Sequence, residues 1–188
     1  RADLILGTTP VYVEESPFLK DVQHKTSFLP IGVDPYHWLS DEIKDIRAQY
    51  PGKKIIFSMG RLVSYKGYEY LISAMTHLPE EYVLLIGSDG PLKEQLQQQI
   101  EELGLKDRVT LLGGLKEEKK QAYFGACDVF CLSSVMKTEA YAIVLVEAMS
   151  LGRPVIATKI PESGVSWVNA HEVSGLNVPV RDPEALAE

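Results

Sequence analysis

Short apolar runs alternate with amphipathic stretches along most of this chain, and turn residues separate the two kinds of segment. Runs of strand length rich in Val, Ile and Leu indicate buried strands, and apolar positions three or four apart indicate helices. A further helix is expected to begin after Asp182, an N-cap residue that precedes Pro183. The pattern predicts strands at 3–6, 27–30, 54–58, 82–86, 109–112, 129–132, 155–157 and 175–178, and helices near 40–49, 67–78, 91–104, 116–125, 141–151 and 164–168.

The alternation of strand and helix becomes regular from residue 54 onward. Regular alternation is typical of βαβ units, which build a parallel sheet with helices on both faces. Because such crossovers are right-handed, we expect an α/β fold with a Rossmann-like doubly wound parallel sheet. Residues 34–52, which include Pro35, Pro51 and Gly52, are interpreted as a linker region. Ligands of such sheets bind at the carboxyl ends of the strands.

The most unusual segment runs from Glu139 to Met149, where apolar residues occupy almost every position between and after two glutamates. Placed on a helix, these residues cover every side of the cylinder, which predicts a buried helix. Glu147 then has no obvious face toward solvent, and a lone buried carboxylate is costly unless it is hydrogen-bonded. Glu147 is therefore either an ordinary acid at a helix rim or an acceptor that points into a ligand pocket and binds hydroxyl groups.

Two cations follow the strand expected at 54–58, Arg61 directly and Lys66 close to the start of the next helix. A cation is unfavourable at a helix N-terminus, which carries a partial positive charge of about half a unit. An anion bound there would reverse the sign of the interaction, and the flanking Gly60 and Gly67 allow close backbone approach. The pair is thus a candidate diphosphate site, the alternative being two solvated surface cations.

The spacing of Glu139 and Glu147 resembles the acidic E-x7-E signature of retaining glycosyltransferases of family 4, also called glycosyl transferases group 1, which have the GT-B fold. Further segments resemble other motifs of that family, in the family's order, across roughly residues 28–186. They are similar to its phosphate-binding loop, its G-x-G-P-L turn, the strand leading into the E-x7-E loop, and the turn that enters the C-terminal domain. The phosphate-binding loop corresponds to residues 58–67 and the G-x-G-P-L turn to residues 86–92. The strand leading into the E-x7-E loop corresponds to residues 126–134, and the turn that enters the C-terminal domain to residues 30–34.

The resemblance implies that residues 53–188 are the C-terminal, donor-binding domain of a GT-B enzyme, truncated at its own C-terminus. It implies a nucleotide-sugar donor carried on GDP or UDP, no metal, and transfer to an acceptor hydroxyl with retention of configuration. Arg61 and Lys66 would stabilise the leaving diphosphate and Glu139 would lie beside the transferred sugar, which makes these three the catalytic set. The matching donor-binding positions are Gly60, the backbone near Leu115 that meets the nucleobase, the N–H groups of Ala142, Ile143 and Val144, and Glu147, which accepts bonds from the ribose.

Two positions depart from the family pattern. The family usually has Gly where Ala142 stands and often Phe where Tyr141 stands, which bears on donor preference. Two other functions stay open: a GT-B-fold epimerase that acts on sugar nucleotides, and a non-catalytic α/β module that binds nucleotides. The combination of Arg61 and Lys66 with the two glutamates favours the transferase.

Residues 1–33 resemble the last part of an N-terminal, acceptor-binding domain. Because most of that domain is not in this chain, we expect the chain alone to be inactive as a transferase. Its acceptor, a sugar or a lipid-linked sugar, would bind through the missing domain. The segment 160–178 is similar to bacterial sugar transferases of lipopolysaccharide or capsule synthesis, some of which use GDP-mannose. The reduced state expected of the two cysteines and the lack of a secretory signal indicate a cytoplasmic protein, with at most peripheral association with the inner face of the membrane.

Composition argues against several other classes of function. The formal net charge of −7 argues against nucleic acid as a partner. The four histidines are isolated in sequence, so a metal site is not expected. Cys127 and Cys131 are expected to be reduced, buried thiols on one face of a strand, and no apolar run is long enough to span a membrane. The charged run 116–120 is interpreted as a solvated helix start.

Overall fold

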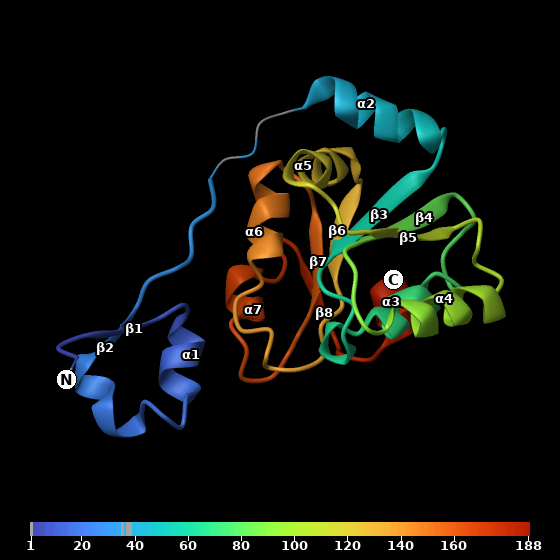
Figure 1. The fold of residues 1–188 in the computed structure, drawn as a ribbon. Helices are drawn as coiled ribbons and strands as arrows, with labels where there is room; N and C mark the ends of the chain where they lie inside the picture. Colours follow the sequence, from blue (N-terminus) through green and yellow to red (C-terminus); the bar gives the residue numbers. More distant parts are fainter. Residues whose placement is uncertain (1, 35, 37–38) are drawn as a thin grey trace.

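Two parallel sheets form the fold (Figure 1). The computed structural model describes residues 2–34, 36 and 39–188, so expectations for Pro35 and His37 concern residues outside this set. The smaller sheet belongs to the N-terminal segment and has two strands. The elements of this segment are β1 (Ile5–Gly7), α1 (Pro10–Glu15), η1 (Lys20–Lys25) and β2 (Thr26–Phe28).

The larger sheet has six parallel strands in the order β5-β4-β3-β6-β7-β8. Helices connect these strands along the chain, which confirms the predicted α/β fold with a doubly wound parallel sheet. Each strand expected from an apolar run is present, with small shifts at its ends. The strands of this sheet are β3 (Lys54–Met59), β4 (Tyr82–Gly87), β5 (Val109–Gly113), β6 (Val129–Leu132), β7 (Val155–Thr158) and β8 (Leu176–Val178).

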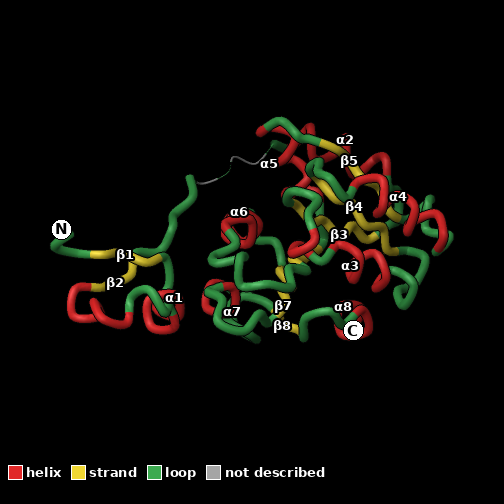
Figure 2. Tube along the Cα trace, turned by 60° about the horizontal axis from the view of Figure 1, so that its bottom comes forward, coloured by secondary structure: helices red, strands yellow, loops and turns green. Residues whose placement is uncertain are grey.

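Helices pack on the two faces of the larger sheet in separate layers (Figure 2). One hydrophobic cluster contains side chains of α2, α5, α6 and α7, and the other contains side chains of α3, α4 and α8. None of the helices in the described part of the chain has the length and apolar character that crossing a bilayer requires. The helices are α2 (Ser40–Gln49), η2 (Ser64–Lys66), α3 (Tyr68–Ala74), α4 (Lys93–Glu102), α5 (Glu117–Ala126), α6 (Ile143–Ser150), α7 (Val165–Val168) and α8 (Pro183–Ala187).

Side chains of the central strands alternate between the two clusters, as a sheet covered on both faces requires. In β3, Ile55 and Phe57 enter the cluster of α2, α5 and α6, whereas Ile56 enters the cluster of α3 and α4. Phe57 meets Phe124 and Phe130 edge to face, with ring centroids 5.1 and 5.9 Å away. Full burial of such a side chain contributes about 1.5–3 kcal/mol. This core holds β3 and β6 side by side and so fixes where their ends lie.

An ion pair fastens α2 to the amino ends of β3 and β6. Two guanidinium nitrogens of Arg47 donate to the two carboxylate oxygens of Asp128 at 2.9 and 2.7 Å, and the N–H of Ile55 donates to the same carboxylate at 2.7 Å. Burial acts to raise the pKa of Asp128, but these hydrogen bonds outweigh it and hold the pKa below its ordinary value. The helix predicted at 40–49 is confirmed as α2, and its Ile43 and Ile46 pack in the same hydrophobic cluster as α5 and the strands.

Two helices differ from the prediction. α3 ends at Ala74 rather than near residue 78, and the residues before Pro79 form tighter turns because a helix cannot continue into proline. α1 was not predicted, although Thr9 and Pro10 form the same cap signal that correctly predicts α8. The Thr9 hydroxyl accepts from the N–H of Tyr12 at 3.1 Å, as an N-cap residue does.

α6 is less buried than predicted. Leu145 and Ala148 are buried, but Ile143 is 40% exposed and Ser150 is exposed. The expectation that this helix has no exposed face is wrong. α6 packs against α5, β6 and β7 on one side only, and its apolar residues continue onto the open side.

The two cysteines are buried and free, as expected, but they do not share a face. Cys127 follows the end of α5 and lies in the cluster with α5 and α6, whereas Cys131 lies in β6 and enters the opposite cluster. The predicted shared face is wrong because the strand begins only at Val129. Burial raises the pKa of both thiols to about 12, so both stay protonated near neutral pH.

Candidate functional site

The strand order of the larger sheet changes direction between β3 and β6. From β3 the chain continues outward to β4 and β5, and then returns to place β6 on the other side of β3. The loops after β3 and β6 therefore diverge at the carboxyl edge, where doubly wound sheets bind ligands. Gly67 keeps these loops close together: its φ is 64°, and an added Cβ would collide with the carbonyl oxygen of Ser133.

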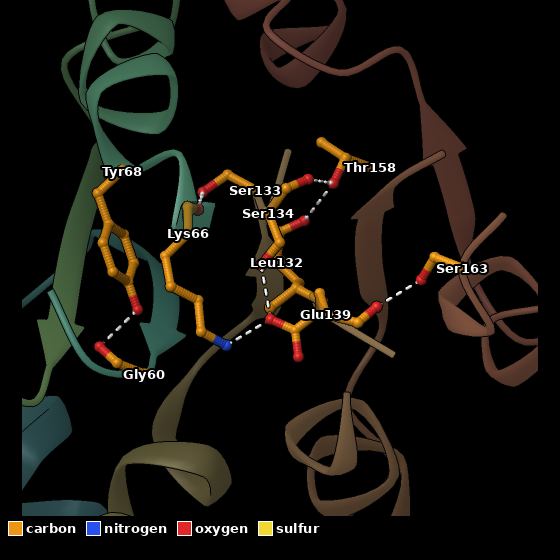
Figure 3. Close-up of polar contacts among 9 residues, drawn as sticks. All are labelled: Gly60, Lys66, Tyr68, Leu132, Ser133, Ser134, Glu139, Thr158 and Ser163. Atoms are coloured by element: carbon orange, nitrogen blue, oxygen red, sulfur yellow. Dashed lines mark hydrogen bonds and ion pairs between the residues drawn. The ribbon is translucent and has the colours of Figure 1, made fainter. Parts of the chain in front are cut away.

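Lys66 and Glu139 meet between these two loops (Figure 3). Lys66 ends η2 after β3, and its Nζ donates to Oε2 of Glu139, in the loop after β6, at 2.5 Å. The two side chains are only 9% and 11% exposed. Taking both charges out of water is costly, so a buried ion pair is weak evidence for stability. Its position at a strand-order reversal makes it a functional-site candidate instead.

Hydrogen bonds from the neighbouring loops hold the Glu139 carboxylate in place (Figure 3). Ser134 Oγ donates to Oε2 of Glu139 at 2.8 Å, and Ser163 Oγ donates to the Glu139 carbonyl oxygen at 2.5 Å. Thr158, at the end of β7, donates to the carbonyl oxygen of Ser134. The second carboxylate oxygen, Oε1, accepts no hydrogen bond in the described part of the chain and is accessible to solvent. Glu139 is thus fixed through one oxygen while the other stays available to a ligand.

Arg61 and Gly60 lie at the same edge, directly after β3. The Arg61 side chain is exposed and has no ion-pair or hydrogen-bond partner among the described residues. Gly60 has φ of 153°, and an added Cβ would lie 2.9 Å from Cε of Lys66, so glycine leaves room for that side chain. The turn after β4 supports this loop, because the N–H of Leu62 donates to the carbonyl oxygen of Asp89 at 3.1 Å.

α6 begins at this edge with an unusual backbone. Its N-cap residue, Ala142, has φ of 62° and ψ of 66°, a left-handed conformation that is unfavourable for a residue with a Cβ. The N–H groups of Ala142, Ile143 and Val144 donate to no acceptor among the residues that the structure describes. Free N–H groups at the positive end of a helix are suited to bind an anion.

Glu147 lies one turn further along α6 and forms a second group with Tyr36 and Lys120, here called the Glu147 cluster. Oε1 of Glu147 accepts from the Tyr36 hydroxyl at 2.6 Å and from Nζ of Lys120 at 2.9 Å. The Glu147 and Lys120 side chains are 12% and 16% exposed. Burial acts to lower the pKa of Lys120, but its contacts with Tyr36, Glu147 and Glu117 outweigh it and raise the pKa above its ordinary value. Lys120 therefore stays charged at neutral pH.

The Glu147 cluster corrects two expectations. The charged run 116–120 is not solvated throughout, because Lys120 turns inward to Glu147 and lies 5.4 Å from the centre of the Tyr36 ring. Glu147 is neither an exposed rim acid nor an isolated one, since two protein donors fill one of its oxygens. Its Oε2 accepts nothing from the described residues and is accessible to solvent. No sequence signal marks Tyr36 as a partner, because it lies 111 residues from Glu147.

Leu115 follows β5 at the same edge of the sheet. Its side chain packs over Gly87, where an added Cβ would lie 2.8 Å from Cδ1 of Leu115. Gly114 beside it is exposed and has open space around its Cα, so the backbone here is accessible. Of the residues selected from the sequence, Lys66 and Glu139 are in direct contact, while Leu115 and Glu147 lie in separate surroundings.

The charges of the site suit an anionic ligand. Among the residues that the structure describes, no group of three His, Cys, Asp or Glu side chains could hold a metal ion. The carboxylates are instead each paired with a lysine, Glu139 with Lys66 and Glu147 with Lys120. Arg61 and the N–H groups at the start of α6, which have no partner in the described part of the chain, add further positive potential at the same edge.

Comparison with known proteins identifies the family. The pattern of the family described as "Glycosyl transferases group 1" matches residues 40–188, and the chain belongs to this family. The O-antigen chain mannosyltransferase C of Escherichia coli is 31% identical over 99% of this chain and 49% of that protein. The D-rhamnosyltransferase WbpZ of Pseudomonas aeruginosa is 28% identical over 99% of this chain and 48% of that protein. The chain thus spans about half the length of these relatives.

Solved structures with the same fold include nucleotide complexes. The crystal structure of Anabaena HepE in complex with UDP matches with a TM-score of 0.89 and 27% identity, over 99% of this chain and 52% of that one. Sucrose-phosphate synthase from Thermosynechococcus elongatus matches with a TM-score of 0.85 and 27% identity, over 100% of this chain and 48% of that one. These matches confirm the expected half of a GT-B fold.

Proposed function

We propose that this chain binds a nucleoside diphosphate sugar and presents it for transfer to an acceptor hydroxyl. The observation that carries the proposal is the buried contact of Lys66 with Glu139 at the reversal of strand order, with Oε1 of Glu139 left available. UDP is the nucleotide in the HepE complex, and GDP is the alternative carrier. The cations at this edge, Arg61 and Lys66, support a donor site in which protein cations rather than a metal contact the diphosphate.

Three groups would bind the diphosphate. Among the residues that the structure describes, the Arg61 guanidinium has no partner, the Lys66 ammonium group has one acidic partner, and the N–H groups of residues 142–144 have no acceptor. Transfer of the sugar builds negative charge on the leaving diphosphate. Cations and N–H groups fixed in place before the reaction stabilise that charge without having to reorganise. Arg61 and Lys66 are therefore the proposed catalytic cations.

The two glutamates would bind the two sugar parts of the donor by accepting hydrogen bonds from their hydroxyl groups. Each has one carboxylate oxygen bound inside the protein and one oxygen accessible, and each accessible oxygen can accept hydroxyl hydrogens. We assign Glu139 to the transferred sugar because it pairs with the diphosphate-binding Lys66, and Glu147 to the ribose because it lies further along α6. The transferred sugar would keep its anomeric configuration, which NMR of the product tests.

The rest of the enzyme follows from the same proposal. Residues 53–188 would be the donor-binding domain, 34–52 the connection between domains, and 1–33 part of the acceptor-binding domain. The acceptor would be a sugar or a lipid-linked sugar in bacterial polysaccharide or lipopolysaccharide synthesis, as the O-antigen name of the E. coli relative supports. Such an enzyme would work in the cytoplasm, in peripheral contact with the inner face of the membrane.

Calorimetric titration tests this function. UDP or GDP should bind at least about tenfold more tightly than uridine or guanosine, because charged hydrogen bonds to the diphosphate contribute about 1.5–3 kcal/mol each. Arg61→Ala should remove much of this advantage, whereas the control Lys106→Met, which loses only a surface ion pair with Glu101, should not. Equal affinity for nucleosides and their diphosphates would refute the proposal.

Metal independence is tested in the same titrations. EDTA should leave nucleotide affinity unchanged, because lysine and arginine side chains occupy the place that a divalent cation takes in other phosphate sites. If EDTA abolished binding and Mg²⁺ or Mn²⁺ restored it, the assignment of Arg61 and Lys66 as the diphosphate ligands would have to be abandoned.

A further inference from the structure

In the Glu147 cluster, two donors from distant parts of the chain share one carboxylate oxygen. Tyr36 and Lys120 both donate to Oε1 of Glu147, at 2.6 and 2.9 Å. We propose that Tyr36 and Lys120 are positioning residues that lock the Glu147 carboxylate through Oε1, so that the ribose of the donor binds to Oε2. This inference rests on the proposed ribose contact of Glu147.

The number of acceptor sites on a carboxylate limits how a ribose can bind. Each oxygen has two lone pairs, so the two donors saturate Oε1. The acceptor sites that remain on Glu147 both lie on Oε2, which is not fully buried and has no partner in the described part of the chain. The direction from which ribose hydroxyls can approach is therefore set by Tyr36 and Lys120.

Lys120 is itself held in one place. Its Nζ also pairs with Glu117 at 3.0 Å and lies 5.4 Å from the centre of the Tyr36 ring. Its side chain is 16% exposed, although it belongs to a helix whose first turn is otherwise exposed. Three partners restrict a long and flexible side chain, so the oxygen that it binds is restricted as well.

Tyr36 is anchored by packing. Its ring lies 6.0 Å from the ring of Phe124, a fully buried residue of α5 that contacts Phe57 and Phe130 in the core. The Tyr36 hydroxyl is thus placed by the core and points at Glu147. Burial and the hydrogen bond to Glu147 both raise the pKa of Tyr36, so its hydroxyl stays a donor through the neutral range.

The structure also permits an opposite role for Tyr36. Its hydroxyl could substitute for a ribose hydroxyl and leave when the nucleotide binds, in which case it would compete with the ligand. The two roles predict opposite signs for Tyr36→Phe: loss of a positioning donor weakens nucleotide binding, whereas loss of a competitor strengthens it. The packed ring and the Oε2 atom, which is left without a partner among the described residues, favour positioning, because a ligand that binds Oε2 does not have to displace Tyr36 from Oε1.

The test is calorimetric titration of UDP and GDP, each beside its 2′-deoxy and 3′-deoxy forms. In the wild type, removal of a ribose hydroxyl that donates to Glu147 should weaken nucleotide binding about 3- to 10-fold, which corresponds to one hydrogen bond. Glu147→Gln, the reference variant, should reduce this ribose preference. Tyr36→Phe and Lys120→Met should each weaken binding of the ribonucleotide about 3- to 10-fold and reduce the preference in the same way.

Matched controls separate positioning from general damage. Tyr50→Phe removes a half-buried hydroxyl that has no hydrogen-bond partner among the described residues, and Lys106→Met removes a surface ion pair with Glu101. Both should keep the wild-type ribose preference. Lys120→Arg keeps a cation beside Glu147 and should restore most of the preference that Lys120→Met loses.

Each outcome has one meaning. If Glu147→Gln leaves the ribose preference unchanged, the ribose contact in the proposed function is wrong. If Glu147→Gln reduces the preference while Tyr36→Phe and Lys120→Met retain it, the contact stands and the positioning role is overturned. Tighter nucleotide binding by Tyr36→Phe overturns it too, in favour of competition. Circular dichroism melts show which variants are folded, and titrations are compared only between folded proteins.

Discussion

An ion pair lies at each end of the neighbouring strands β3 and β6, and the two pairs differ in which carboxylate oxygens are left without a partner. At the amino ends, Arg47 and the N–H of Ile55 fill both carboxylate oxygens of Asp128. At the carboxyl ends, Lys66 and Ser134 donate to one oxygen of Glu139 and the other oxygen has no described partner. Both oxygens of Asp128 thus have a partner within the fold, whereas one oxygen of Glu139 is left as an acceptor for a ligand.

Burial makes the contrast sharper. The side chains of Arg47 and Asp128 are 36% and 33% exposed, whereas those of Lys66 and Glu139 are 9% and 11% exposed. The more deeply buried pair, Lys66 with Glu139, is therefore the one that leaves a carboxylate oxygen without a described partner. Stability alone would favour the reverse arrangement, because a more deeply buried ion pair loses more hydration and needs more hydrogen bonds to offset that loss. The cost at the carboxyl ends is explained if a bound ligand completes the set.

The backbone shows the same asymmetry. Of the five described residues other than glycine with positive φ, four lie in the segments that follow a strand of the larger sheet and one, Glu172, lies before β8. The four are Ser88 after β4, Ala142 after β6, Glu162 after β7 and Arg181 after β8. Such conformations cost of order 1 kcal/mol or more and persist where surrounding structure imposes them, often at functional sites. The carboxyl edge thus combines strained backbone with incompletely paired charge.

The largest expected effect is on ligand binding at the carboxyl ends. Lys66→Met should weaken UDP or GDP binding by about 2–3 kcal/mol, roughly 30- to 150-fold, because a buried cation that contacts the diphosphate is lost. Calorimetry measures the affinity and urea unfolding the stability. The double variant Lys66→Met/Glu139→Gln should regain stability, since it no longer buries an unpaired carboxylate, without regaining affinity. If the single variant bound nucleotide normally, the functional half of the comparison would be refuted.

A change at the amino ends should have the opposite outcome. Asp128→Ala removes the acceptor of Arg47 and Ile55 and should lower the free energy of unfolding by about 2 kcal/mol, a value reduced because the pair is about one-third exposed. Nucleotide affinity of the folded protein should not change. Urea unfolding and calorimetry measure the two quantities, and a clear loss of affinity would show that the two ends are coupled.

Acid should also weaken the pair of Arg47 and Asp128, with a smaller effect on the free energy of unfolding. Burial acts to raise the pKa of Asp128, but the bonds from Arg47 and Ile55 lower it below its unfolded value of about 3.9. The contribution of this pair is therefore complete above the unfolded pKa and is lost as pH falls through the lower folded pKa. Urea unfolding between pH 7 and pH 2.5 should show a steeper acid loss in the wild type than in Asp128→Asn. The surface variant Asp41→Asn should follow the wild type.

The fold was largely predictable because apolar runs and their spacing report local structure and burial. β3 through β8 match the predicted runs, and the reversal of strand order places Lys66 and Glu139 together, as a doubly wound sheet requires. Motif resemblance selected the two glutamates, but it contained no information on which of their oxygens are occupied. That depends on side-chain geometry, as the bonds from Ser134 and Tyr36 show.

Other features were not predictable for specific physical reasons. Tyr36 reaches Glu147 only through tertiary packing across 111 residues, and no local period encodes such a contact. Lys120 looks like a solvated charge in sequence because its neighbours are charged, and only the position of α6 turns it inward. The exposed side of α6 was missed because apolar residues cover the whole helix, so periodicity could not show which side packs.

The smallest expected effect is that of Ala142→Gly, at the start of α6. Ala142→Gly removes the clash of a Cβ at φ of 62°, which favours the folded state by about 1 kcal/mol, but it also removes a buried methyl group worth about 0.8 kcal/mol and loosens the unfolded chain. These contributions nearly cancel, so urea unfolding should show a change within about 1 kcal/mol. Ala142→Val, with a branched Cβ in the same conformation, should lose about 1–3 kcal/mol and weaken nucleotide binding, because α6 can relax only by moving the N–H groups of residues 142–144. If valine were tolerated as well as glycine, the backbone at this edge would not be strained, and the difference between the two ends of β3 and β6 would reduce to their side-chain pairing alone.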